Sequence, residues 1–283
     1  MNARRPNPRM FALPAPPPAA LEVGGAGYRL VRVLKHDFFA ATCLYESAAK
    51  PARGRAKVPA KVVVKFGRSQ DFCGLPIGWV GQYFIDREET IYKVLAGLEG
   101  LPRCLGRVEG KGLAIEFIEG AALDRTAAIP AGFFDRLRVL LGAVHARGVA
   151  YCDTNKRSNI LIGPGGRPYL IDFQISLRRR DDLPWPLSAV MRRMVRYMMD
   201  KDLYYLYKHK RRLCPQELTA EEEAISRRIS GLHWLHVKLA TPYRALRRRF
   251  LNSQFRRGRL VSPTAEIEDE LPEHTTWRRD RPG

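Results

Sequence analysis

The stretch His145–Phe173 reads HARGVAYCDTNKRSNILIGPGGRPYLIDF and carries two carboxylates and an amide at fixed intervals. Asn159 follows Asp153 by six residues, and Asp172 follows Asn159 by thirteen. Short apolar runs on either side of a Gly/Pro-rich turn predict two strands between the amide and the second carboxylate. Carboxylate and amide oxygens are the groups that hold Mg2+ and orient a hydroxyl. The pattern therefore predicts phosphoryl transfer.

The size and composition of the chain limit its class. Its 283 residues suffice for one two-lobed domain or two small ones. The five cysteines are odd in number and form no CxxC pair, so neither a disulfide framework nor a zinc site is indicated. No apolar run is long enough to span a membrane, and prolines interrupt the N-terminal segment, so no signal peptide is expected. These features predict a cytoplasmic protein, and peripheral contact with the inner membrane stays open.

Positive charge is concentrated late in the chain. Of the net charge of +20, residues 173–260 carry +13, from 21 Lys/Arg and 8 Asp/Glu. Such a field attracts phosphate-rich partners, namely an anionic membrane, a phosphorylated glycolipid or nucleic acid. A solvated basic surface is an equal alternative. Nucleic acid is the least favoured partner, because no aromatic stacking platform or DNA-binding motif accompanies the charge.

The pattern of apolar residues divides the chain into four parts. Residues 1–26 are rich in Pro and Ala and predict a disordered lead-in. Residues 27–118 predict a β-rich N-lobe, with strands at 28–34, 42–45 and 58–66, a helix at 84–98 and a hairpin at 105–118. Residues 119–261 predict a helical C-lobe that includes the carboxylate-bearing loop. Residues 262–283 predict an acidic flexible tail. The fold class expected is α+β.

Helices dominate the predicted C-lobe. Apolar spacing predicts one helix at 129–147 and others at 187–212 and 232–250. An apolar Met/Val/Leu stripe is expected to pack into the lobe, its members being Leu187, Val190, Met191, Met194, Val195 and Met198. The basic side chains of the same helices are expected to face an anionic surface, and these are Arg192, Arg193, Arg196, Lys208, Lys210, Arg211 and Arg212.

Two further charged residues complete the chemistry that phosphoryl transfer needs. Lys65 ends the apolar strand sequence Val-Val-Val-Lys, and Glu88 lies 23 residues later on the helix that follows. A lysine in this position can neutralise phosphate oxygens, and a glutamate can hold that lysine in place. Alone, the strand-end lysine is more often a surface residue, and the ordered set of motifs is what favours the catalytic interpretation.

Between residues 28 and 176 the ordered motifs resemble the protein-kinase-like superfamily, whose two-lobed fold joins an antiparallel β-rich N-lobe to a mainly helical C-lobe. The resemblance implies ATP and Mg2+ as cofactors. By it, Lys65 contacts the α- and β-phosphates, Glu88 pairs with that lysine, and the backbone from Glu116 to Ile118 binds adenine. The same resemblance makes Asp153 the catalytic base, Lys156 the lysine of the catalytic loop, and Asn159 and Asp172 the magnesium ligands.

Several positions depart from the family pattern. One residue is inserted between Asp153 and Lys156, Tyr151-Cys152 replaces His-Arg, and Gln174 replaces the glycine of D-F-G. The loop at 36–42 contains no glycine, and alanine does not readily adopt positive φ, so weaker nucleotide contacts are expected. No A-P-E segment follows Asp172, so a long peptide-docking segment is not expected.

A narrower resemblance rests on Lys201-Asp202-Leu203-Tyr204-Tyr205-Leu206. This run is similar to a segment of the small-lobed bacterial kinases that phosphorylate lipopolysaccharide-core sugars, and more distantly of the RIO kinases. An ordinary amphipathic helix turn explains the same residues equally well. Aromatic packing is the better interpretation of Tyr92, Tyr151 and Phe173, and His145 is expected to cap a helix end.

Two classes of function follow. The leading hypothesis is an ATP- and Mg2+-dependent kinase that phosphorylates a hydroxyl, either on an envelope glycan such as lipopolysaccharide core or on a protein Ser/Thr. The alternative is a pseudokinase, a binding or scaffold protein that has lost transfer activity. The lysine, both carboxylates and the asparagine are all present, which favours the enzyme.

Overall fold

The structure is a computed structural model that describes residues 10–48, 59–72, 74–109, 111–124 and 128–228, with positions 249, 250, 253, 257, 264 and 267. Its contacts define two units. The first contains the described residues within Met1–Asp86, Leu105–Phe117 and Ser230–Gly283. The second contains those within Arg87–Cys104 and Ile118–Ile229. None of the described helices is both long and apolar enough to cross a membrane.

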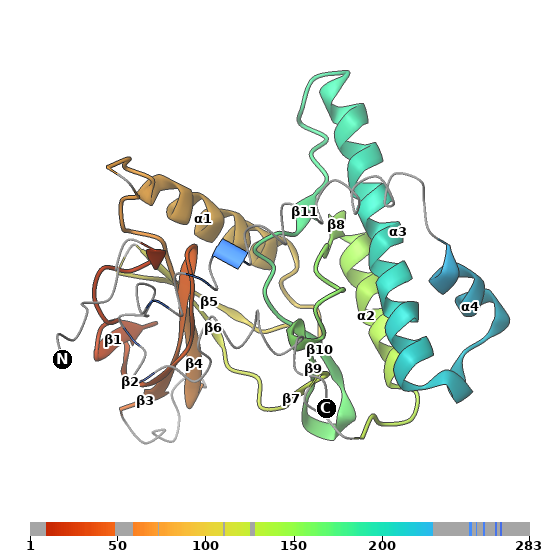
Figure 1. Ribbon diagram of the computed structural model, residues 1–283, viewed down its shortest axis with the longest axis horizontal. Helices are drawn as coiled ribbons and strands as arrows, with labels where there is room; N and C mark the ends of the chain where they lie inside the picture. The colour runs from red at the N-terminus through yellow and green to blue at the C-terminus, as the bar shows by residue number, and fades with distance from the viewer. Residues whose placement is uncertain are drawn as a thin grey trace. The chain divides into compact units, whose positions relative to one another are not determined.

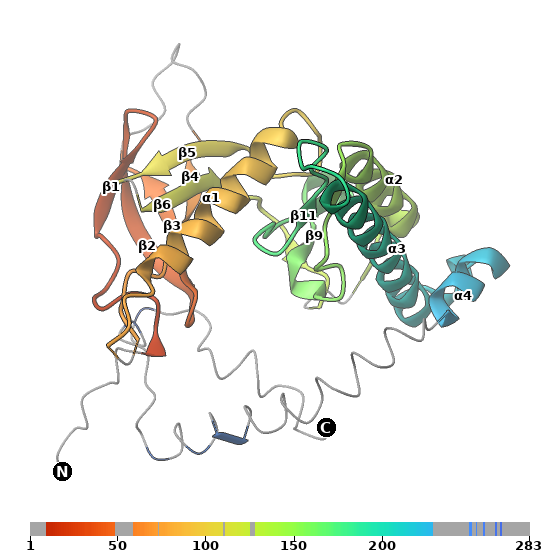
Figure 2. The same ribbon diagram turned by 90° about the horizontal axis from the view of Figure 1, so that it is seen from above.

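The first unit is built on a six-stranded sheet with the order β1-β2-β3-β4-β6-β5 (Figure 1). Its strands are β1 (Ala20–Val23), β2 (Ala26–His36), β3 (Ala40–Ser47), β4 (Lys61–Gly67), β5 (Cys104–Val108) and β6 (Gly112–Glu116). The pairs β1–β2, β2–β3, β3–β4 and β4–β6 are antiparallel. Figure 2 shows the sheet curling from β1 to β5.

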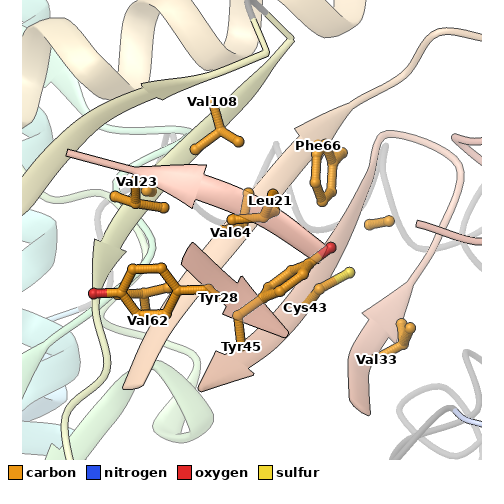
Figure 3. Close-up of a cluster of buried hydrophobic side chains, with 12 residues drawn as sticks. Leu21, Val23, Tyr28, Val33, Cys43, Tyr45, Val62, Val64, Phe66 and Val108 are labelled. Carbon is orange, nitrogen blue, oxygen red and sulfur yellow. The ribbon is translucent and has the colours of Figure 1, made fainter. Parts of the chain in front are cut away.

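A hydrophobic core covers one face of this sheet (Figure 3). In β4 the alternate residues Val62, Val64 and Phe66 belong to that core. Because successive side chains of a strand point to opposite faces, Lys65 lies on the other face. The two core tyrosines keep their hydroxyls satisfied, since Tyr28 donates to the Pro59 carbonyl and Tyr45 to the Pro18 carbonyl, each at 2.8 Å. The core therefore fixes which way Lys65 points.

The N-terminal segment is ordered from residue 10 onward, so the predicted disordered lead-in is wrong for residues 10–26. Leu21 and Val23 of β1 join the core, and Phe11 is buried. The Leu13 amide donates to Nε2 of His36 at 3.1 Å. Prolines exclude a helix here, but they do not exclude burial of the apolar residues between them. Residues 1–9 lie outside the described part of the chain.

Helix α1 (Gly78–Val94) begins in the first unit and ends in the second. Its first turns approach the end of β4 backbone to backbone. A Cβ added at Gly81 would lie 2.2 Å from the Arg68 nitrogen, and one added at Gly67 would lie 2.6 Å from the Gly81 carbonyl oxygen. Contacts that short do not occur, so only glycine permits this packing.

The second unit is mainly helical. It contains α2 (Phe133–Ala146), α3 (Leu187–Leu213) and α4 (Ala220–Arg227), and Figure 1 shows α2 and α3 side by side. Its short strands are β7 (Ala121–Ala122), β8 (Val149–Ala150), β9 (Ile160–Ile162), β10 (Pro168–Leu170) and β11 (Leu177–Arg178). The predicted apolar stripe of α2 is buried, comprising Phe133, Phe134, Leu137, Leu140, Leu141 and Val144.

Two features of α3 correct the predictions for the basic helices. Of the expected stripe only Val195 is fully buried, and Leu187, Val190 and Met194 are exposed. Lys210 is buried instead of facing an anionic surface. Its ammonium contacts Asp135 at 2.8 Å and Glu222 at 2.9 Å, so it ties α3 to α2 and α4. A buried charge is retained only when it is paired in this way.

The α+β class is confirmed, with an antiparallel sheet in the first unit and helices in the second. Helix α1 follows β4, and the strands β5 and β6 follow α1, which is the order of elements expected from the sequence. Most of the helix expected at 232–250 and most of the acidic tail fall outside the described residues. Thr264 and Ile267 are exceptions, because Thr264 contacts Nδ1 of His36 at 3.1 Å and the Ile267 carbonyl accepts from Val33.

Candidate active site

The loop between β8 and β9 brings three of the predicted site residues into direct contact. One carboxylate oxygen of Asp153 accepts from the Lys156 ammonium at 2.8 Å and from the Asn159 amide nitrogen at 2.7 Å. Asp153 and Asn159 are buried, whereas the Lys156 side chain is 55% exposed. Charge-assisted hydrogen bonds of this length are strong and directional. They hold the carboxylate in one orientation at the edge of solvent.

The extra residue expected between Asp153 and Lys156 does not prevent Asp153 from contacting Lys156 and Asn159. A turn closes from the Lys156 amide to the Asp153 carbonyl at 2.9 Å, and the Asn159 amide then donates to the Lys156 carbonyl at 3.1 Å. The second turn is a short 3-10 helix at Arg157–Asn159. The extra residue is thus absorbed in the backbone, while the side chains of Asp153, Lys156 and Asn159 still converge.

Asp172 follows β10 in a left-handed backbone conformation, with φ 64°. The backbone on its N-terminal side is fixed because the Ile171 amide donates to the Asn159 carbonyl at 3.1 Å and the Tyr151 hydroxyl donates to the Ile171 carbonyl. On its C-terminal side the Phe173 ring stacks edge-on against Tyr151. Cys152 is also left-handed, with φ 68°. Such conformations cost about 1–3 kcal/mol each and concentrate at functional sites.

Glu88 on α1 lies against the Asp172 segment within the second unit. The side chain is fully buried, and its carboxylate accepts from the Phe173 amide at 3.3 Å. The neighbouring Arg87 donates to the Ser176 carbonyl at 2.6 Å, and the Ser176 hydroxyl donates to the Tyr151 carbonyl at 2.9 Å. Two consecutive residues of α1 therefore hold the backbone that follows Asp172.

Asp202 on α3 belongs to the run that carries the narrower resemblance, but its role at the site was not predicted. The side chain is 1% exposed. One of its oxygens accepts from the Tyr151 amide at 2.8 Å, and the other accepts from the Cys152 amide at 2.9 Å and the Thr154 hydroxyl at 2.7 Å. His145 also contacts it at 3.1 Å, so this histidine does more than end a helix. Through these hydrogen bonds Asp202 holds the backbone of the loop that carries Asp153 in place.

Burial shifts the titration of several groups around the loop. Burial, with the charge of Asp202, raises the pKa of the Cys152 thiol to about 12, so this cysteine is no nucleophile at neutral pH. Burial raises the pKa of Tyr92, and the carboxylates of Glu88 and Asp172 raise it further. Burial lowers the pKa of His209 to about 4, and its Nε2 contacts the Thr154 carbonyl at 3.0 Å. The site thus holds a neutral thiol, phenol and imidazole around its carboxylates.

The remaining predicted residues lie on the sheet and at the boundary of the units. Lys65 is 7% exposed and pairs with Thr42 on β3 and Leu113 on β6. Glu116 ends β6 opposite Val62. The predicted adenine-binding segment runs across the point at which the chain passes from the first unit to the second, between Phe117 and Ile118.

The glycine-free loop between β2 and β3 is held by hydrogen bonds among its own residues. One carboxylate oxygen of Asp37 accepts from the Phe39 amide at 2.8 Å and the Ala40 amide at 3.0 Å, and the Asp37 amide donates to the Ala40 carbonyl at 3.0 Å. No residue of this loop has positive φ. The loop therefore forms a tight turn without the conformation that glycine would supply.

Arg68, the residue directly after β4, anchors that loop. Its guanidinium donates to the carbonyls of Gln70 at 2.7 Å, Phe38 at 2.8 Å and Phe11 at 3.3 Å, and it lies 4.0 Å from the centre of the Phe38 ring. The side chain is 1% exposed. Burial lowers the pKa of this guanidinium, but an arginine side chain still remains protonated. No sequence pattern indicated this role.

Comparison with known proteins supplies a likeness of fold. No family model matches the sequence, and no curated protein matches it. Among solved structures, the Rio2 kinase of Chaetomium thermophilum, in an ADP/Mg2+-phosphoaspartate complex, is similar with a TM-score of 0.47 and 15% identity. The match covers 70% of this chain and 58% of that chain. The geometry of the site therefore has to carry any statement of function.

Proposed function

We propose that this chain is an ATP- and Mg2+-dependent phosphotransferase. The observation that carries the proposal is the carboxylate of Asp153, held on one oxygen by both Lys156 and Asn159 at the edge of solvent. A carboxylate fixed in this way can orient an acceptor hydroxyl and take its proton. The left-handed backbone at Cys152 and Asp172 supports it, because such strain is retained where function requires it.

The residues beside Asp153 fit a magnesium ion. The side-chain nitrogen of Asn159 donates to Asp153, so the side-chain oxygen of Asn159 is the atom left for a cation. Asp172 supplies a carboxylate. Among the described residues no cluster of three or more His, Cys, Asp or Glu side chains forms a metal site. Two oxygen ligands suit Mg2+, which takes its other ligands from phosphates and water. The ion would neutralise charge on the transferred phosphoryl group.

In the proposed reaction the acceptor oxygen attacks the γ-phosphorus of ATP. A bond forms between that oxygen and phosphorus, the bond from phosphorus to the β,γ-bridging oxygen breaks, and ADP leaves. Asp153 takes the hydroxyl proton, and Lys156 balances charge beside it. Lys65 would bind the α- and β-phosphates, with Glu88 as its partner, and the backbone of Glu116 and Ile118 would bind adenine.

The acceptor is a hydroxyl of an envelope glycan, such as lipopolysaccharide core, or of a protein Ser/Thr. We place the protein in the cytoplasm, with peripheral contact at an anionic membrane. The pseudokinase alternative is supported by the loop at Asp37–Ala40, because its Phe39 and Ala40 amides already donate to the carboxylate of Asp37. The enzyme is favoured because Asp153 keeps its partners despite the insertion.

Thermal unfolding and transfer assays separate the two functions. Mg2+-ATP should raise the melting temperature of the full chain, as any ligand of the native state does, and Lys65→Ala and Asp172→Asn should lose most of that shift. Asp153→Asn should keep the shift but lose transfer from radiolabelled ATP to lipopolysaccharide or total protein, because its role lies in the transition state. Absence of a shift at millimolar nucleotide would refute the phosphotransferase and leave only the scaffold function, and turnover in Asp153→Asn would refute the role of Asp153.

A further inference from the structure

The N-terminal half of α3 carries apolar side chains that are exposed in the described part of the chain. Trp185 is 81% exposed, Leu187 56%, Val190 62% and Met194 40%. The last three are spaced by three and four residues, so they lie on one face of the helix. Their side chains are turned away from the buried face, which carries Val195 and Asp202. Figure 1 shows these first turns of α3 projecting beyond α2.

Positive charge surrounds this apolar face. Between Ile175 and Arg196 the chain has six arginines against two aspartates, a net charge of +4. Asp181 and Asp182 are paired with Arg179 at 2.8 Å, Arg180 at 2.7 Å and Arg192 at 3.6 Å. In the described part of the chain Arg193 and Arg196 form no ion pair, and both are exposed. Their charge is available to a partner.

We propose that this surface, comprising Trp185, Leu187, Val190 and Met194 with Arg193 and Arg196, docks on an anionic lipid bilayer. A tryptophan and aliphatic side chains on one face of a helix, with arginines on its polar side, are typical of helices that lie in the membrane interface. Arginine stems are long enough to bring the guanidinium to the headgroups. An acidic protein partner would suit the arginines but not the apolar side chains.

The position of this surface also fits the proposed transfer reaction, on which the next step rests. β11, which leads to the surface, pairs with β8, with Leu177 opposite Ala150. Ala150 precedes Asp153 by three residues, and the exposed Ile175 follows Asp172 by three. The segment that follows Asp172 therefore leads to the proposed surface through a strand that pairs next to the Asp153 loop. The acceptor hydroxyl is accordingly one presented at a membrane surface.

Vesicle co-sedimentation of the full chain tests the docking without any assay of transfer. Vesicles of phosphatidylcholine alone are compared with vesicles containing about one third phosphatidylglycerol. On the anionic vesicles each arginine near the surface should raise the partition coefficient of the protein about fivefold. Arg193→Ala with Arg196→Ala should lower binding about 25-fold. Trp185→Ala should lower it about tenfold, since one buried aromatic side chain is removed from the interface. Added salt should weaken binding, because it screens over roughly 8 Å at 0.15 M.

Trp79 provides the matched control. It is 69% exposed on α1 of the first unit, outside the proposed surface, and Trp79→Ala should leave vesicle binding unchanged. All of these side chains are exposed, so the melting temperatures of the variants should stay near that of the parent protein. The proposal is overturned if the parent binds neither vesicle, if it binds both equally, or if Trp79→Ala weakens binding as much as Trp185→Ala does. It is also overturned if Trp185→Ala dissolves a dimer seen without lipid, because the surface would then join two copies. None of these outcomes depends on transfer activity, so docking and catalysis fail or stand separately.

Discussion

The loop at Asp37–Ala40 in the first unit and the proposed catalytic loop at Cys152–Asn159 in the second are held in opposite ways. In the first, the buried cation Arg68 donates to backbone carbonyls. In the second, the buried anion Asp202 accepts from the amides of Tyr151 and Cys152. Both are 1% exposed and both come from a different segment of the chain.

This difference explains how two loops that depart from the family pattern keep defined shapes. The loop without glycine is held by a cation that donates to backbone carbonyls. The loop with an inserted residue is held by an anion that accepts from backbone amides. In each case one charged side chain satisfies several backbone groups at once, which a neutral residue of the same size cannot do. Removing either ion should therefore damage its own loop and leave the other loop intact.

The largest effect is expected at Asp202. Asp202→Ala leaves two backbone amides and the Thr154 hydroxyl without their acceptor, and should lower the free energy of unfolding by about 3–5 kcal/mol. Asp202→Asn keeps the size and one acceptor oxygen, and should cost about 2 kcal/mol. In that variant kcat should fall while KM for ATP changes little, because only the catalytic loop is misplaced.

The matched control for Asp202 is Asp200→Asn, two residues earlier on α3 and exposed. It should change stability by no more than about 0.5 kcal/mol. Urea unfolding and steady-state kinetics give both quantities. If Asp202→Ala unfolds at the same urea concentration as Asp200→Asn, the catalytic loop does not depend on this anion.

The second effect is expected at Arg68. Arg68→Met fills the same space but leaves the carbonyls of Phe38 and Gln70 without a donor, and should lower the free energy of unfolding by about 2–4 kcal/mol. Arg68→Lys keeps the charge without the planar fork and should recover part of the loss. Arg29→Met, on the exposed side of β2, serves as the control and should be nearly neutral.

The readout that separates the two loops is turnover at saturating ATP. Arg68→Met should change the affinity for ATP more than kcat, whereas Asp202→Asn should do the reverse. Equal effects of both variants on kcat and KM would show that the loops are not held independently.

Much of the fold could be predicted because its signals are local. Alternation along β4, the apolar spacing of α2, and the two apolar runs around the turn at 163–166 each lie within a few residues. The contact of Asp153 with Lys156 and Asn159 was also within reach, because the spacing between them is short. Their proposed roles in transfer remain predictions.

What the sequence could not reveal depends on contacts between distant residues. Asp202 lies 50 residues from Cys152, and Arg68 lies 30 residues from Phe38. A signal for Asp202 did exist, since a carboxylate on the same helix face as Val195 and Leu206 must find buried donors. The exposed stripe on α3 was misassigned for the opposite reason, because apolar spacing shows that residues share a face but not what covers that face.

The third expected effect is the pH dependence of stability, to which one histidine from each unit contributes. Burial lowers the pKa of His36 to about 4, partly offset by Asp37, and that of His209 also to about 4. Both are neutral when folded, whereas the unfolded chain binds protons below about pH 6.5. Stability should therefore fall as the pH drops from about 6.5 to 4, by about 1.4 kcal/mol per unit of pKa difference for each histidine.

His36→Leu and His209→Leu should each reduce the slope of the free energy of unfolding against pH by the contribution of one bound proton. Each should also lower the free energy of unfolding at pH 7. For His36 the loss includes its bonds to Leu13 and Thr264. Chemical unfolding of the parent and both variants at several pH values between 5 and 7 measures the slopes. If the slope is the same in all three, the two histidines are not held neutral in the folded state.

The smallest effect is expected at Asp37, inside the loop that Arg68 anchors. Burial alone would raise the pKa of Asp37, but Lys35 and the amides of Ala40 and Phe39 together lower it. Asp37→Ala removes these bonds from a partly exposed turn and should cost about 1 kcal/mol, whereas Asp37→Asn keeps the acceptor and should cost less. Because Asp37→Ala frees the Phe39 and Ala40 amides and removes a negative charge, it should also increase the stabilisation by Mg2+-ATP if the loop covers the phosphates. Thermal unfolding with and without nucleotide measures both changes. An unchanged or smaller nucleotide shift in Asp37→Ala would mean that the amides of this loop do not reach the nucleotide, so Arg68 would hold a structural turn and Asp202 alone would hold a catalytic one.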